Sequence, residues 1–135
     1  MVWLSVLAIC RVGYTIRVEM AITVLIVDDH PSFRASARML LEAEGFEVVG
    51  EAADGLTAIE AVHELQPQMV LLDVQLPDID GFEVAARLTA NGSAPAVVLT
   101  SSRDVGDLGP LGESAQVRGF IPKSELSGAA LEALL

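Results

Sequence analysis

The chain has 135 residues, of which 52% are hydrophobic, a formal net charge of −11 and a single cysteine. This length is typical of one domain, since domains usually have about 100–200 residues. The acidic charge argues against direct binding of nucleic acid, because non-specific attachment to phosphates requires a surface rich in Lys and Arg. Cys10 alone can form neither an intramolecular disulfide nor a cysteine-based metal site.

The first 19 residues differ in character from the rest. The apolar stretch from Val2 to Ile9 is too short to span a bilayer, which requires about 20 residues. Its arginines follow the stretch, whereas a signal peptide carries basic residues in front of it. Met20 is followed at once by a new apolar run. We therefore predict that residues 1–19 are a disordered extension or a misplaced start, that residues 20–135 form the folded domain, and that no membrane is involved.

From Met20 onward, short apolar runs alternate with helical patterns. The Ile22–Val27 run has almost no polar alternation, which is typical of a strand buried on both faces. Together the runs predict strands at Ile22–Val27, Phe46–Ala52, Met69–Leu72, Ala96–Leu99 and Gly119–Ile121, of which Phe46–Ala52 is weaker. Apolar residues at helical spacing predict helices over Ser32–Glu44, around Ala58–Leu65, around Phe82–Ala90 and over Gly128–Leu135. Ser127 should cap the last of these, with Leu131, Leu134 and Leu135 facing inward.

This alternation predicts an α/β fold. Strands that alternate with helices form a parallel sheet with helices on both faces. Right-handed crossovers then produce a doubly wound domain. In such domains, ligands bind outside the carboxyl ends of the strands. The residues that follow each predicted strand are therefore the candidates for function.

Charged and hydroxyl side chains follow four of the predicted strands, namely Asp28 and Asp29, Asp73, Thr100 and Lys123. Three carboxylates held close together raise one another's pKa values by repulsion. Mg²⁺ relieves this repulsion, because it prefers a few carboxylates together with waters and phosphate oxygens. A carboxylate can also act as a nucleophile and form an acyl phosphate. Asp73 stands alone after the central strand, so we predict that it accepts a phosphoryl group whose oxygens contact Lys123 and Thr100.

Several segments in this order resemble the receiver domain of bacterial two-component response regulators, namely Val24–Pro31, Leu71–Pro77, Asp80-Gly81, Thr100 and Gly119–Lys123. Each segment is weak alone, and their order and spacing across residues 21–135 carry the resemblance. Asp28–Pro31 and Phe120–Ser124 are most similar to the branch that usually carries a helix-turn-helix output domain. The resemblance implies a flavodoxin-like sheet of five strands in the order 2-1-3-4-5 and a role in phosphorelay signal transduction.

The resemblance also implies roles for the matching residues. A sensor histidine kinase or a phosphotransfer protein would phosphorylate Asp73. Asp29, Asp73 and the backbone carbonyl of Gln75 would ligate Mg²⁺, and Asp28 would act mostly through bound water. These roles make Mg²⁺ the expected cofactor.

The remaining implied roles concern the response to phosphorylation. Thr100 would be the switch hydroxyl, and Lys123 would contact the phosphoryl group. Phe120 stands where the family has a switching aromatic residue, often Tyr. The loss of the phenol removes a hydrogen bond, but the change of rotamer stays possible.

The main departure from the family lies between Arg103 and Arg118, where a full helix is normally present. Gly106, Gly109-Pro110 and Gly112 predict a shorter or irregular element there. This region usually transmits the signal. The mode of output is therefore less predictable than the chemistry.

The sequence ends at the last receiver helix, so we expect a stand-alone receiver that works in the cytoplasm. It would promote only its own phosphorylation and dephosphorylation and would not otherwise be an enzyme. Its downstream partner would be a protein rather than DNA. The docking surface would consist of Arg103–Gln116, Phe120 and the last helix.

Three other functions fit parts of the pattern. A flavodoxin-like FMN binder is disfavoured, because Asp28 and Asp29 would repel the phosphate from the first loop. A phosphatase with an aspartate nucleophile carries a second acid two residues later, where this sequence has Gln75. A degenerate receiver that binds partners without phosphorylation stays open as the alternative.

Ordinary structural interpretations also apply to these residues taken singly. Asp28-Asp29 could cap the first helix, and Asp73 could be a turn residue at a strand end. The whole set of carboxylates, hydroxyl and ammonium favours the functional interpretation. His30 and His63 we interpret as exposed polar residues rather than as metal ligands, because no second metal-type pair surrounds either.

Overall fold

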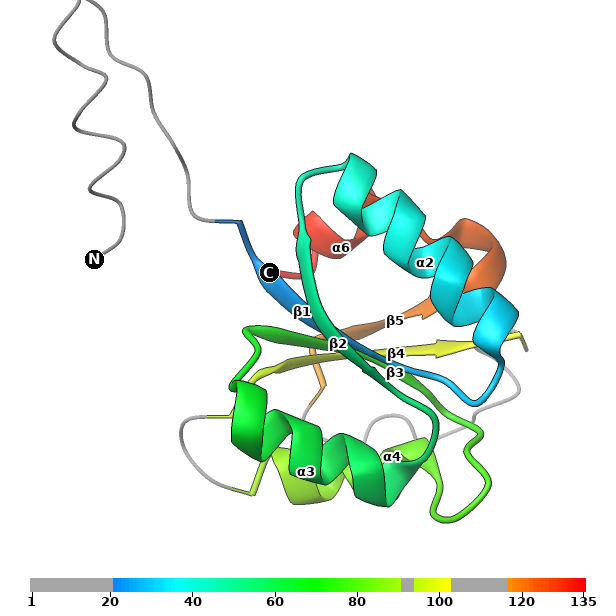
Figure 1. Ribbon diagram of the computed structural model, residues 1–135, viewed down its shortest axis with the longest axis vertical. Coiled ribbons are helices and arrows are strands. Elements are labelled where there is room, and N and C mark those ends of the chain that lie inside the picture. Colours follow the sequence, from blue (N-terminus) through cyan, green and yellow to red (C-terminus); the bar gives the residue numbers. More distant parts are fainter. Residues whose placement is uncertain (1–20, 91–93, 103–116) are drawn as a thin grey trace, which may run out of the picture.

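The computed structural model describes residues 21–90, 94–102 and 117–135 (Figure 1). Five parallel strands form one sheet in the order β2-β1-β3-β4-β5, which confirms the predicted doubly wound topology. The strands are β1 (Thr23–Val27), β2 (Glu47–Ala52), β3 (Met69–Asp73), β4 (Ala96–Ser101) and β5 (Gly119–Pro122). The predictions for residues 1–19 and for the altered helix at 103–116 lie outside the described residues.

Helices cover both faces of the sheet. They are α2 (Pro31–Ala43), α3 (Gly55–Leu65), α4 (Gly81–Leu88) and α6 (Gly128–Glu132), with a short 3₁₀ turn at Lys123–Glu125. Figure 1 shows α2 and α6 on one face and α3 and α4 on the other. No helix of the described residues is long and apolar enough to cross a membrane.

The strands alternate between two hydrophobic cores, one on each face. Val24, Ile26 and Leu71 belong to the core beneath α2 and α6. Leu25 and Leu72 belong to the core beneath α3 and α4. Successive side chains of a strand point to opposite faces, and here both faces are apolar. This double burial explains why β1, β3 and β4 appear in the sequence as apolar runs.

Helix boundaries follow local chemistry. Pro31 occupies the first turn of α2, where a missing N–H costs nothing. Gly45, just after that helix, has a φ of 96°, a conformation that glycine adopts without strain. Ser127 caps α6 by accepting a hydrogen bond from Ala130 N at 3.0 Å, as predicted.

Two helix predictions are wrong in extent. The helix predicted around Phe82–Ala90 begins one residue earlier, after the cap Asp80, and ends at Leu88. The last helix ends at Glu132 rather than Leu135. Leu135 is 45% exposed, so it does not face inward, whereas Leu131 is fully buried. Leucine has a high helix propensity but does not mark a helix end. The predicted helix therefore extended beyond the observed end of α6.

Candidate functional site

Strand register brings Asp73 and Thr100 side by side at the carboxyl edge of the sheet. The two residues are direct partners in the pairing of β3 with β4. Both strands extend beyond their predicted ends, so these residues belong to the strands rather than to the loops after them. Their neighbours Leu72 and Leu99 face α3 and α4, so alternation turns Asp73 and Thr100 towards the face of α2.

Asp28 joins this pair from the next strand. It follows Val27, which faces α3 and α4, so alternation places Asp28 on the α2 face as well. Asp28, Asp73 and Thr100 are all at least 97% buried. Buried carboxylates are costly unless they are paired. The structure therefore requires a counter-charge at this edge.

Lys123 supplies that charge from the end of β5. Its Nζ lies 2.6 Å from Asp28 Oδ2 and 3.3 Å from Asp73 Oδ2. The ammonium also lies 4.5 Å from the centre of the Phe33 ring, a cation–π contact from α2. Burial by itself would lower the pKa of Lys123, but the two carboxylates outweigh it and raise the pKa. Lys123 therefore stays charged at neutral pH.

The two buried carboxylates titrate differently. Burial, together with the nearby charge of Asp28, raises the pKa of Asp73 to about 6, although Gln75 N and Lys123 act in the opposite direction. The hydrogen bond from Gln75 N to Asp73 Oδ1 is 3.1 Å long. Burial also acts to raise the pKa of Asp28, but Lys123 and the backbone N–H of His30 hold it below its usual value. Asp28 is therefore the firmly charged member and Asp73 the more proton-accepting one.

His30 makes contacts that the sequence did not reveal. Its ring is 65% exposed, as expected, but Nδ1 lies 3.0 Å from Asp28 Oδ1 and 3.1 Å from Asp29 Oδ1. Its backbone N–H also donates to Asp28 Oδ1 at 2.8 Å. One ligand atom from each of Asp28, Asp29, His30 and Asp73 lies within 4.8 Å of the others. The interpretation of His30 as an ordinary surface residue was therefore incomplete.

Arg34 is a second residue that sequence reasoning missed. Its Nη1 donates to the Asp28 carbonyl at 2.7 Å, and its Nε donates to Glu51 on β2 at 2.9 Å. Arg34 lies four residues after the helix cap His30, which brings it back over the strand end. The sequence signal for this contact was a basic residue about one turn after the acidic pair. Arg34 holds the main chain in place at Asp28.

Thr100 has the unsatisfied group of the site. Its Oγ1 is buried and makes no hydrogen bond within the described residues. A buried hydroxyl without a partner costs about 1–3 kcal/mol. Asp28 Oδ2 also makes no hydrogen bond, but it forms the ion pair with Lys123. The Thr100 hydroxyl is thus available to a group that enters beside Asp73.

Phe120 and Gln75 occupy less direct positions. Phe120 is half-buried, pairs with Leu99 in the sheet and packs against the core beneath α3 and α4. It therefore lies on the face opposite to the carboxylates. Gln75 is exposed and contacts the site through its backbone N–H on Asp73.

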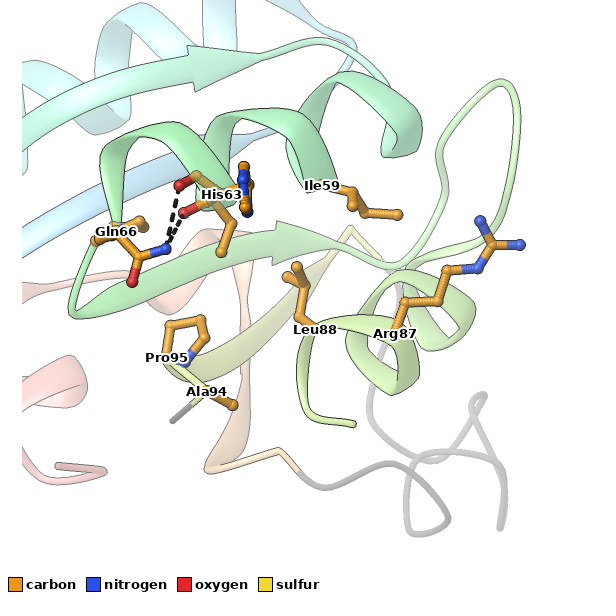
Figure 2. A pocket seen from close by; sticks show the side chains of 9 residues that line it. Ile59, His63, Gln66, Arg87, Leu88, Ala94 and Pro95 are labelled. Carbon is orange, nitrogen blue, oxygen red and sulfur yellow. Dashed lines mark hydrogen bonds between the residues drawn. The ribbon is translucent and has the colours of Figure 1, made fainter. Parts of the chain in front are cut away.

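The opposite edge of the sheet has a cavity of about 180 Å³. It lies between the ends of α3 and α4 and the starts of β3 and β4 (Figure 2). His63, the other histidine, lines it. The Gln66 amide donates to carbonyls of its own helix at 3.3 and 3.1 Å. Arg87, whose guanidinium points away from the cavity in Figure 2, pairs with Glu83 of its own helix at 2.9 Å.

Known proteins share this sequence pattern and this fold. The sequence matches the response regulator receiver domain family over residues 24–134. A protein of Pseudomonas aeruginosa named as a transcriptional regulator is 38% identical over 102 residues, which is 76% of this chain and 49% of that protein. The transcriptional regulatory protein PdtaR of Mycobacterium tuberculosis is 34% identical over 113 residues, which is 77% of this chain and 55% of that protein.

A solved structure agrees with the sequence matches. The signal receiver domain of NarL from Mycobacterium tuberculosis superposes with a TM-score of 0.76 and 31% identity. The match covers 86% of this chain and 98% of that domain. The chain spans about half the length of the curated relatives it matches.

Proposed function

The chain belongs to the response regulator receiver domain family, and on that premise we propose that Asp73 is the residue that accepts the phosphoryl group in phosphorelay signalling. A carboxylate oxygen of Asp73 would attack the phosphorus of a phosphohistidine. The new O–P bond forms as the donor P–N bond breaks, and the leaving imidazole takes up a proton. The observation that carries this proposal is the burial of Asp73 beside Lys123, with its Nζ at 3.3 Å.

Lys123 and Thr100 act on the phosphoryl oxygens in this proposal. Phosphoryl transfer requires mainly positioning and neutralisation of charge. Lys123 supplies a compact positive charge within reach of Asp73. The Thr100 hydroxyl, which has no hydrogen-bond partner among the described residues, can donate to an oxygen that arrives beside its strand partner. The entering group would thus satisfy a hydrogen bond that the unmodified protein leaves open.

The oxygen-rich cluster fits Mg²⁺, the cation that receiver domains bind at their acidic pocket. Carboxylate oxygens of Asp28, Asp29 and Asp73 lie within 4.8 Å of one another, and Mg²⁺ prefers such hard oxygen donors. We propose Asp29, Asp73 and the Gln75 carbonyl as direct ligands, with Asp28 acting through water. When bound, the ion neutralises charge on the transferred phosphoryl group.

Labelling by a small phosphodonor tests this function. With acetyl phosphate and Mg²⁺, mass spectrometry should show one added phosphoryl group, located on Asp73 by peptide mapping. EDTA or Asp29→Ala should strongly reduce the labelling, because each removes part of the charge neutralisation. Undiminished labelling in EDTA would contradict the role of Mg²⁺. A wild-type protein that takes up no phosphoryl group would leave the phosphorylation-independent interaction module as the function.

The partners in this proposal are proteins. The phosphoryl donor would be a sensor histidine kinase or a phosphotransfer protein, and the transfer would take place in the cytoplasm. The domain itself would not contact nucleic acid, because the chain has a net charge of −11. Named relatives are transcriptional regulators, so the response would be passed to a protein or domain that controls expression.

Phosphorylation would bias a pre-existing equilibrium between two conformations. Thr100 would move towards the phosphoryl group, and Phe120 would turn inward. Hydrogen exchange of the unmodified and beryllofluoride-bound forms tests this switch. Protection should change mainly between Thr100 and Lys123. A change centred on α2 instead would show that the signal leaves by another face.

A further inference from the structure

The loop of residues 74–80 joins β3 to α4, and both of its ends are fixed. Val74 N donates to the Thr100 carbonyl at 2.9 Å, and Gly81 N donates to the Val74 carbonyl at 2.7 Å. Asp80 caps α4 by accepting from Glu83 N at 2.8 Å. The position of the loop tip between these ends depends on contacts with another part of the fold.

Asp78 makes those contacts with the first turn of α3. Its Oδ1 accepts from Gly55 N at 2.8 Å, and its Oδ2 accepts from Leu56 N at 2.9 Å. These are two of the N–H groups that a helix leaves without an internal partner, and they favour an anion. The Gly55 N–H, followed by the other backbone donors, lowers the pKa of Asp78 to about 2. The carboxylate is therefore charged throughout the neutral range.

Close packing accompanies these hydrogen bonds. A Cβ atom on Gly55 would lie 2.5 Å from Ile79 Cγ1 and 2.8 Å from Val84 Cγ2. Only a glycine lets the first turn of α3 approach the loop this closely without displacing it. The tip of the loop is therefore held against α3 by two hydrogen bonds and by direct packing.

The helix does not depend on Asp78 for an ordinary cap. Asp54, which immediately precedes α3, already accepts a hydrogen bond from Thr57 N at 2.8 Å. That bond lies within the helix's own first turn and involves no residue of the loop. Asp78 reaches the same helix end from 23 residues away in the sequence. The two carboxylates therefore share one helix terminus, but only Asp78 can fix the loop.

The loop in turn controls the backbone beside the proposed phosphorylation site. Gln75 N donates to Asp73 Oδ1 at 3.1 Å, and the Gln75 carbonyl is the proposed third ligand of Mg²⁺. On the basis of the proposed function, we infer that Asp78 is a positioning residue of the metal site. By binding the tip of the loop to α3, it holds the Gln75 backbone in the position that Mg²⁺ requires.

Comparison of Asp78→Ala with Asp54→Ala in the full chain tests this inference. Both substitutions remove a carboxylate from the same helix end, so both should lower the melting temperature. Asp78→Ala should also weaken Mg²⁺ binding, measured by calorimetry, by about tenfold, the lower end of the loss typical when a supporting group is removed. Asp78→Asn keeps one acceptor oxygen and should give an intermediate loss. Asp54→Ala should bind Mg²⁺ like the wild type.

Labelling by acetyl phosphate over a range of Mg²⁺ concentrations provides a second readout. The rate for Asp78→Ala should fall at low Mg²⁺ and recover at saturating Mg²⁺, because Asp73 and Lys123 are intact. Hydrogen exchange should show faster exchange at Gly55 and Leu56 in Asp78→Ala.

The outcomes separate this inference from the proposed function. Equal Mg²⁺ affinities for Asp78→Ala and Asp54→Ala would overturn the inference, whether both match the wild type or both are weakened to the same degree. That result would leave the function intact as long as the wild type binds Mg²⁺ and is labelled. A wild type that neither binds Mg²⁺ nor is labelled would overturn the function itself.

Discussion

At the carboxyl edge of the sheet, Asp28, Asp73 and Lys123 come from three different strands or strand ends, and Lys123 contacts both carboxylates. At the amino edge, two polar side chains at the cavity of Figure 2 bond within their own helices, Gln66 to the Val62 carbonyl and Arg87 to Glu83. The same strands build both edges. Burying polar groups that converge from distant segments costs folding free energy, so such a cluster indicates a functional site. Polar groups that bond within their own helix indicate only an ordinary helix end.

The strongest test of this comparison is the loss of the phosphoryl acceptor. Asp73→Asn should reduce labelling by acetyl phosphate at least about 100-fold, because the amide is not a nucleophile. His63→Ala, at the cavity edge, should be labelled at the wild-type rate. Equal labelling of Asp73→Asn and the wild type would show that the carboxyl edge is not the acceptor site.

Lys123→Ala should also separate the two edges. It removes the ammonium that faces Asp73, so labelling should slow by about 100-fold, a typical loss for one charge-stabilising group. It also leaves Asp28 buried without its partner, which should cost about 3–5 kcal/mol in urea unfolding at pH 7. Arg118→Ala, at the other end of β5, serves as the control. Its Nη1 donates to the Leu134 carbonyl at 3.4 Å, at the C-terminal end of the described chain.

The raised pKa of Asp73 predicts that Asp73→Asn is more stable than the wild type, by an amount that depends on pH. A folded pKa of about 6, above the usual value of 3.8, means that the charged carboxylate opposes folding above pH 6. This penalty shrinks as the pH falls from about 6 towards 3.8 and is lost below that. In EDTA, Asp73→Asn should therefore be more stable than the wild type by about 1–3 kcal/mol at pH 7.5 and should show no gain near pH 4. A gain of equal size at both pH values would contradict the titration.

Arg34 and Arg38 offer a matched pair with a smaller expected effect. Both donate to Glu51, but only Arg34 also donates to the Asp28 carbonyl. Arg34→Ala should lower the free energy of unfolding by about 1–2 kcal/mol and slow labelling a few-fold, because a buried carbonyl loses its partner. Arg38→Ala should cost less than about 1 kcal/mol and leave labelling unchanged. Indistinguishable labelling of the two variants would remove Arg34 from the site.

The smallest effect should come from the first 19 residues. A chain that begins at Met20 should unfold at the same urea concentration as the full chain and be labelled at the same rate. The reason is that the apolar stretch in this segment is too short for membrane insertion and lacks the flanking residues needed for export. A clear loss of stability would show that these residues pack against the domain.

The fold was predictable because its three inner strands, β1, β3 and β4, are buried on both faces. Runs such as Val24–Val27 and Met69–Leu72 can form little else in a chain that alternates them with helical patterns. Helix ends with a chemical signal, such as Pro31 and Ser127, were predicted correctly. The end of α6 was not, because no glycine or proline marks it.

The gathering of Asp28, Asp73 and Lys123 was foreseen because parallel strands end at one edge. The contacts of the residues around them were not predicted. His30 contacts the acidic pair because of its side-chain rotamer, and a rotamer cannot be predicted from the sequence pattern. Asp78 reaches Gly55 across 23 residues, and its hydrogen bonds depend on how the 74–80 loop is placed relative to the start of α3. Such contacts follow from the assembled structure rather than from any local pattern.

The ion pair between Lys123 and the carboxylates has a consequence for charge balance. Asp28, Asp29 and Asp73 with Lys123 sum to two negative charges when Asp73 is ionised, which one divalent cation would neutralise. An acyl phosphate carries about two negative charges where Asp73 carried one. Phosphorylation would therefore leave this edge with a surplus of about one negative charge. That surplus would attract cationic groups to this edge of the sheet.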